Sequence, residues 1–169
     1  MNPQDYKRLL GEIGNLQAIV KERQNKREPF LSSFADALED VVKKARVWFN
    51  EESKLASREI GILEQLSPSQ SFSEEKYNLE GCKKKFEEVA VKFDKTIKSI
   101  RSRQVKSLRD FVRKGFFQTS APEFLGDFEK MFDVCLNLEE LIESLEQGAK
   151  YILSAQRITE IMIESQKQA

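Results

Sequence analysis

Carboxylates are plentiful among the side chains that could do chemistry, and several stand as adjacent pairs. The pairs Glu51-Glu52, Glu87-Glu88 and Glu139-Glu140 have the residue type that general acid–base catalysis uses. That catalysis needs a buried carboxylate with a raised pKa, and nothing in the sequence around these pairs marks them as buried. We therefore interpret them as solvated helix faces, and we expect the protein not to be an enzyme.

The residue types that are missing exclude most other catalytic and metal-binding sites. The chain has 169 residues and no His, so it has no Ser-His-Asp unit, no Cys-His unit and no His-ligated zinc. Its two cysteines are too few for a four-thiolate metal site. No glycine-rich phosphate-binding loop is present. The sequence predicts no metal, no cofactor and no small-molecule substrate.

The elements that carry these residues are predicted to be long helices. Apolar residues recur every three or four positions in four segments, and strand-like alternation is absent. Breaks are expected near Pro29, near Ser67-Pro68 and near Ser120-Ala121-Pro122, because proline ends most helices. We predict helices near residues 3–26, 29–66, 73–118 and 121–167. The periodic residues of the second segment are Phe34, Leu38, Val41, Ala45, Trp48, Leu55, Ile62 and Leu66.

These helices predict an all-α fold, in which residues 1–169 form a single helical-bundle domain. We expect an elongated antiparallel bundle of about four helices, three of them long, with coiled-coil-like packing. We expect any kink or break at a glycine, at Gly61, Gly81, Gly126 or Gly148. Trp48 fits the apolar seam of its helix, and the adjacent Phe49 is expected to be covered by a second neighbouring helix.

The net charge of zero results from the cancellation of two oppositely charged segments. Residues 83–114 contain twelve basic and four acidic residues, whereas residues 123–146 contain eight acidic residues and one basic residue. If the third and fourth helices form a hairpin, these charges attract each other across it. The alternative interpretation is a basic surface for nucleic acid or an anionic membrane. We favour the hairpin because it explains both segments together.

Half of the phenylalanines lie within residues 111–132, at the predicted tip of this hairpin. An aromatic plug that closes one end of the bundle is the favoured interpretation. Adjacent helical residues differ by about 100° in direction, so one phenylalanine of the Phe116-Phe117 pair could be exposed beside basic residues. The candidate interaction residues are Phe116, Phe117, Arg113 and Lys114 at the tip, and Lys84, Lys95, Lys98 and Arg109 along the basic helix.

The two cysteines, Cys82 and Cys135, fall at core-type positions that the hairpin places far apart, so we expect reduced, buried thiols. The N-terminal residues lack a basic segment followed by an apolar run, which a secretory signal would have. We expect a cytoplasmic protein in a reducing compartment. A secreted effector without a cleaved signal is the alternative.

The function that these features favour is non-enzymatic. We expect a scaffold, adaptor or chaperone-like protein that contacts protein partners through helical surfaces and self-associates as a homo-oligomer. The alternative is a peripheral membrane protein or nucleic-acid binder that uses the basic third helix. Lys83-Lys84-Lys85-Phe86 followed by Phe93-Asp94-Lys95 on a long helix is a local likeness to membrane-curving BAR domains. Such strings recur by convergence, and no family is assigned.

Overall fold

Four helices account for the structure, a computed structural model that describes residues 3–26, 32–69, 71–114 and 121–168. Within these ranges the side chains of residues 3, 32, 103–114, 121–132 and 166 are not described. The helices are α1 (Pro3–Lys26), α2 (Ser32–Leu66), α3 (Ser73–Lys114) and α4 (Ala121–Gln168). No strand occurs in the described ranges. The predicted all-α bundle is confirmed, and each helix boundary in the structure lies within four residues of its prediction.

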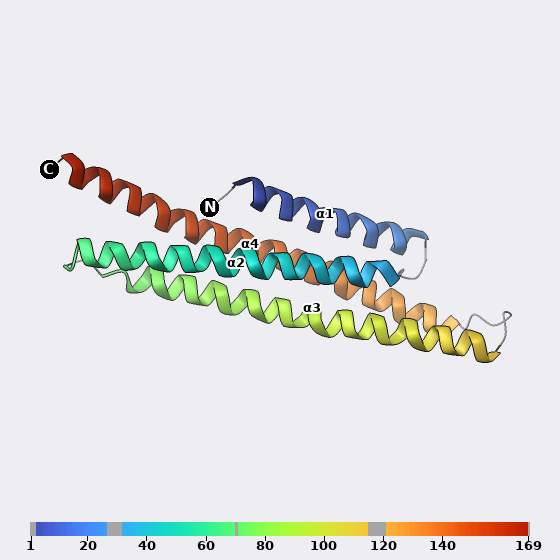
Figure 1. The fold of residues 1–169 in the computed structure, drawn as a ribbon. Coiled ribbons are helices and arrows are strands. Elements are labelled where there is room, and N and C mark those ends of the chain that lie inside the picture. The colour runs from blue at the N-terminus through green and yellow to red at the C-terminus, as the bar shows by residue number, and fades with distance from the viewer. Residues whose placement is uncertain (1–2, 27–31, 70, 115–120, 169) are drawn as a thin grey trace.

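The helices lie side by side in an elongated bundle, with α4 the longest (Figure 1). Its 48 residues span about 72 Å at the usual rise of 1.5 Å per residue. Helices α2, α3 and α4 pack against one another, and α1 packs against α2 and α4. α3 runs antiparallel to both α2 and α4, as the predicted hairpin requires (Figure 1). The long helices bury most of their apolar residues by packing against one another within one chain.

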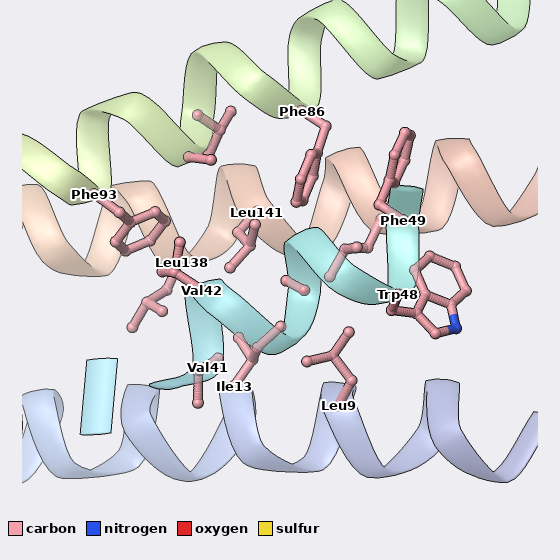
Figure 2. Close-up of a cluster of buried hydrophobic side chains, with 14 of the residues drawn as sticks. Leu9, Ile13, Val41, Val42, Trp48, Phe49, Phe86, Phe93, Leu138 and Leu141 are labelled. Carbon is pink, nitrogen blue, oxygen red and sulfur yellow. The ribbon is translucent and has the colours of Figure 1, made fainter. Parts of the chain in front are cut away.

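The core is formed by apolar side chains from all four helices (Figure 2). α1 contributes Leu9 and Ile13, which face Val41 and Trp48 of α2. On the other side of α2, Phe49 is fully buried, with its ring stacked on that of Phe86 of α3 at a centroid distance of 4.6 Å. The predicted arrangement of Trp48 and Phe49 is therefore confirmed, because each is covered by a different neighbouring helix.

The expected breaks at glycines were wrong, because the helices continue through these residues. α2 continues through Gly61, α3 through Gly81, and α4 through Gly126 and Gly148. At Gly148 the reason for glycine is steric, since an added Cβ would overlap the ring of Phe49. At Gly61 and Gly81 an added Cβ would meet nothing within 4 Å. Gly148 is therefore a close-packing position between α4 and α2, whereas Gly61 and Gly81 are open.

Both cysteines are free thiols, as predicted. Cys82 is buried and Cys135 is half-buried, and burial raises the pKa of each thiol above its ordinary value. A raised thiol pKa lowers the fraction of reactive thiolate at neutral pH. The cysteines therefore have the character of small packing residues.

Candidate protein-interaction surface

The predicted aromatic tip lies largely outside the described residues. Phe116 and Phe117 belong to the stretch 115–120, which is not described, and the side chains of Arg109, Arg113 and Lys114 are likewise outside the description. The proposed plug or contact site at this end of the bundle stays a prediction. The described candidates are Lys84, Lys95 and Lys98.

These three lysines are exposed on the outer side of α3 and have no ion pair among the described residues. Lys84 and Lys95 border an open groove of about 1010 Å³ between α3 and α4, which Tyr77, Val91 and Tyr151 also line. Glu80, Glu87 and Glu88 lie along the same groove. Because glutamates lie among the lysines, they lower the positive potential of the groove. This surface is therefore weakly basic rather than a strong anion-binding site.

The charged residues of α3 pair more with α2 than the hairpin hypothesis expected. Lys92 makes the expected kind of contact to α4, with its Nζ 3.1 Å from Oε2 of Glu140. Arg101, however, pairs with Asp36 and Glu39 of α2. The antiparallel neighbours are as predicted, but α2 supplies much of the neutralising charge that the described part of α3 receives.

α2 and α3 also form ion pairs in which α2 supplies the basic residue and α3 supplies the acidic residues. Arg46 of α2 lies 2.8 Å from Asp94 of α3 and 3.2 Å from Glu87 of α3. Exposed pairs of this kind contribute roughly 0–1 kcal/mol each. They set the register of α2 against α3 more than they stabilise it.

A different surface lies beyond the N-terminal end of α1. The ring of Tyr6, near the start of α1, stacks on Trp48 of α2 with centroids 5.1 Å apart. Burial raises the pKa of Tyr6, and the negative charge of Glu146 of α4 raises it further, so Tyr6 also lies close to α4. α1 begins at Pro3, just before this contact, whereas α2 continues to Leu66 and α4 to Gln168. Figure 1 shows α2 and α4 extending beyond the N-terminal end of α1.

The α1-facing side of α2 remains apolar beyond that point. Leu55 and Ile62 follow Trp48 at intervals of seven residues, so they lie on the same side of the helix. Their exposed fractions are 43% and 46%, against 8% for Trp48, which α1 covers. The sequence assigned Leu55, Ile62 and Leu66 to a seam, and the structure leaves that part of the seam open to solvent.

The matching side of α4 behaves in the same way. Leu153 and Glu160 follow Glu146 at intervals of seven residues, so they continue the side that lies close to Tyr6. Leu153 is 48% exposed. α2 and α4 pack against each other, and repulsion by Glu160 helps to raise the pKa of Glu59 of α2. The two rows therefore belong to one surface. We call this surface the distal strip and define it as Leu55, Glu59, Ile62 and Leu66 of α2 with Leu153, Glu160 and Ile163 of α4.

Glu59 is the electrostatically distinctive residue of the distal strip. Its Oε2 is shielded from solvent and has no hydrogen-bond partner among the described residues. Burial raises the pKa of Glu59, repulsion by Glu160 and Glu52 adds to the shift, and attraction to the chain's amino-terminal charge opposes it. A desolvated carboxylate without a hydrogen-bonding partner destabilises the folded state in which it lies.

Replacing Glu59 with leucine is therefore expected to stabilise the isolated chain. Because the folded-state pKa is raised, protonated Glu59 is compatible with the fold and the ionised form at neutral pH is disfavoured, so removing the charge raises the melting temperature. We expect an increase of at most about 2–4 °C, which corresponds to roughly 1 kcal/mol for a chain of this size, because only one of the two carboxylate oxygens of Glu59 is shielded from solvent. Thermal unfolding followed by circular dichroism at pH 7 measures it, with Glu51→Leu as the exposed control on the same helix. A lower melting temperature for Glu59→Leu would contradict this account of Glu59.

The described ranges contain no group of three or more Cys, Asp or Glu residues placed to hold a metal ion. None of the helices, over its described residues, combines the length and the apolar character that crossing a membrane requires. Comparison with protein-family models, with curated proteins and with solved structures finds no match.

The distal strip was not predicted from the sequence. The seven-residue spacing of Trp48, Leu55 and Ile62 indicated that these residues share one side of the helix, but not that α1 leaves part of that side exposed.

Proposed function

We propose that this protein is a non-enzymatic scaffold or adaptor that works through helix–helix contacts with a protein partner. The observation that supports the proposal most strongly is the exposed apolar row of the distal strip, which continues the face that α1 covers. Exposed apolar patches rimmed by polar residues are typical of protein-interaction sites. A helix laid along such a row contacts it with residues spaced by three, four and seven positions. Self-association is the form of this function in which the partner is a second copy.

The experiment that tests this function compares two matched variants. Ile62→Glu places a charge in the distal strip, and Val47→Glu places the same charge at an α2 residue that is 50% exposed outside it. Each is expressed in the cells from which the sequence comes, and co-purifying proteins are quantified against wild type. We expect at least one protein to be retained by Val47→Glu and lost at least tenfold with Ile62→Glu. Equal recovery with both variants would contradict the proposal.

Light scattering of the purified chain separates the two kinds of partner. A monomer at micromolar concentration would assign the contact to another protein. An oligomer that Ile62→Glu dissociates and Val47→Glu does not would assign it to a second copy.

A second function, binding to nucleic acid or an anionic membrane surface, rests on Lys84, Lys95 and Lys98 of α3, which are exposed and have no ion pair within the described part of the chain. Electrostatic binding of this kind weakens steeply with salt. Reversing the three charges should then abolish binding to anionic vesicles or to nucleic acid at low salt. Unchanged binding by the triple variant would eliminate this function.

A further inference from the structure

We propose that the distal strip receives an amphipathic helix of another protein, and that a Lys or Arg of that helix pairs with Glu59 and Glu160. This inference rests on the proposed function and names the chemistry of the partner. The strip presents two features that the occupant must match: a row of exposed apolar residues and, at its centre, two carboxylates on different helices.

The first reason is continuity with the surface that α1 already occupies. α1 lies on α2 and α4 with its apolar residues against both, and the same two sides continue beyond Tyr6. From Leu55 to Leu66 the uncovered stretch of α2 is about 17 Å long at 1.5 Å per residue, enough for three helical turns. A helix that continues the line of α1 would cover Leu55, Ile62 and Leu153, the most exposed apolar residues of the strip.

The second reason is charge. Apolar contacts alone would dehydrate Glu59 and Glu160 further. The chain's amino-terminal charge attracts Glu59 without cancelling the rise in its pKa, so a contact that brings no further cation to these carboxylates is costly. The α1 contact shows how a charge at such a seam is matched, since Lys44 of α2 lies 3.1 Å from Glu12 of α1. Arg157 of α4 borders the strip, four residues after Leu153. The charged residues within the strip, Glu59 and Glu160, are both acidic, so the complementary residue of the occupant is basic.

The same charges argue against a second copy as the occupant. A two-fold symmetric dimer places the same patch of both chains in contact. Where the two-fold axis passes through the centre of the strip, Glu59 and Glu160 of one copy would lie near Glu59 and Glu160 of the other. Like charges that meet in a contact select against that pairing. A basic helix of another protein both covers the apolar row and neutralises the carboxylates.

The test uses the full chain and two synthetic helical peptides of about 18 residues, long enough to span the uncovered stretch. Both have leucines spaced for the strip and the same composition. In the first peptide two arginines flank the leucine row, and in the second they lie on the opposite face of the helix. Binding is measured by fluorescence anisotropy of the labelled peptides, and circular dichroism checks that every protein variant is folded.

We expect the first peptide to bind wild-type protein at least tenfold more tightly than the second. Glu59→Lys should weaken that binding at least tenfold, whereas Glu51→Lys, at an exposed residue of the same helix outside the strip, should change it less than twofold. A third peptide, with glutamates in place of the arginines of the first, should bind the Glu59→Lys, Glu160→Lys double variant better than wild type. Equal binding of the first two peptides, or equal effects of the two single variants, would overturn the inference.

The proposed function and this inference fail in different ways. If no co-purifying protein depends on Ile62, the proposed function is wrong and the inference falls with it. If a protein is lost with Ile62→Glu but retained with Glu59→Lys, the function stands and the basic helix is wrong. If Ile62→Glu dissociates an oligomer of the chain, the occupant is a second copy and the inference is overturned.

Discussion

Phe49→Ala is expected to lower the free energy of unfolding by about 3–5 kcal/mol, the largest single-residue effect that we expect in this protein. Phe49 has no solvent exposure, and its ring packs in parallel on Phe86 of α3, with an interplanar angle of 1°. On another side the ring lies against the backbone of Gly148 of α4. Truncation would therefore leave a cavity where three helices meet, and rigid helices collapse into such a cavity only partly.

Equilibrium unfolding in urea, followed by circular dichroism, measures the effect. Val47→Ala is the matched control, because Val47 lies two residues earlier on α2 and is half exposed. We expect that variant to stay within about 0.5 kcal/mol of wild type, as surface substitutions usually do. A loss below about 1 kcal/mol for Phe49→Ala would mean that the three helices do not converge on this ring.

The second large effect is expected at Gly148, where alanine should destabilise the fold by about 1–3 kcal/mol although it favours helix formation. An alanine Cβ would overlap the Phe49 ring, which cannot turn away because Phe86 stacks on it. α2 and α4 must then separate, or Phe49 must leave its preferred rotamer. The steric cost outweighs the ~1 kcal/mol that replacing a helical glycine contributes.

Gly81→Ala is the control for Gly148→Ala, since Gly81 is also in a helix interior but has open space where a Cβ would lie. We expect Gly81→Ala to stabilise the chain by about 0.5–1 kcal/mol. Adding Phe49→Leu should relieve part of the cost of Gly148→Ala, because a smaller side chain leaves room for the new methyl group. Strict additivity of those two changes would contradict the contact between them.

The helices themselves were predictable because their pattern is local. Leu79, Cys82, Phe86, Val89 and Phe93 follow the helical repeat without a break, and all five are buried. Prolines and serines between the segments marked the turns, so the number and limits of the helices followed. The antiparallel neighbours α3 and α4 followed from a short connection and opposite charge.

Relations between helices were less predictable, because they depend on which side of each helix meets which neighbour. α2 has two apolar sides: Ala56, Ile60 and Leu63 face the core and are buried, whereas Leu55 and Ile62 lie on the side where α1 has ended. Periodicity alone cannot separate a covered side from an uncovered one. For the same reason Gly148 was expected to be a weak point of its helix, although its role depends on Phe49, 99 positions away.

The most direct test of the distal strip as an interaction surface is site-specific photo-cross-linking in the cells from which the sequence comes. A photoreactive amino acid is placed at Ile62, within the distal strip, and, in a separate variant, at Val47, a similarly exposed residue of α2 outside the strip. Our account predicts a protein adduct from position 62 that is absent from position 47. No adduct at position 62, or the same adducts from both positions, would contradict it.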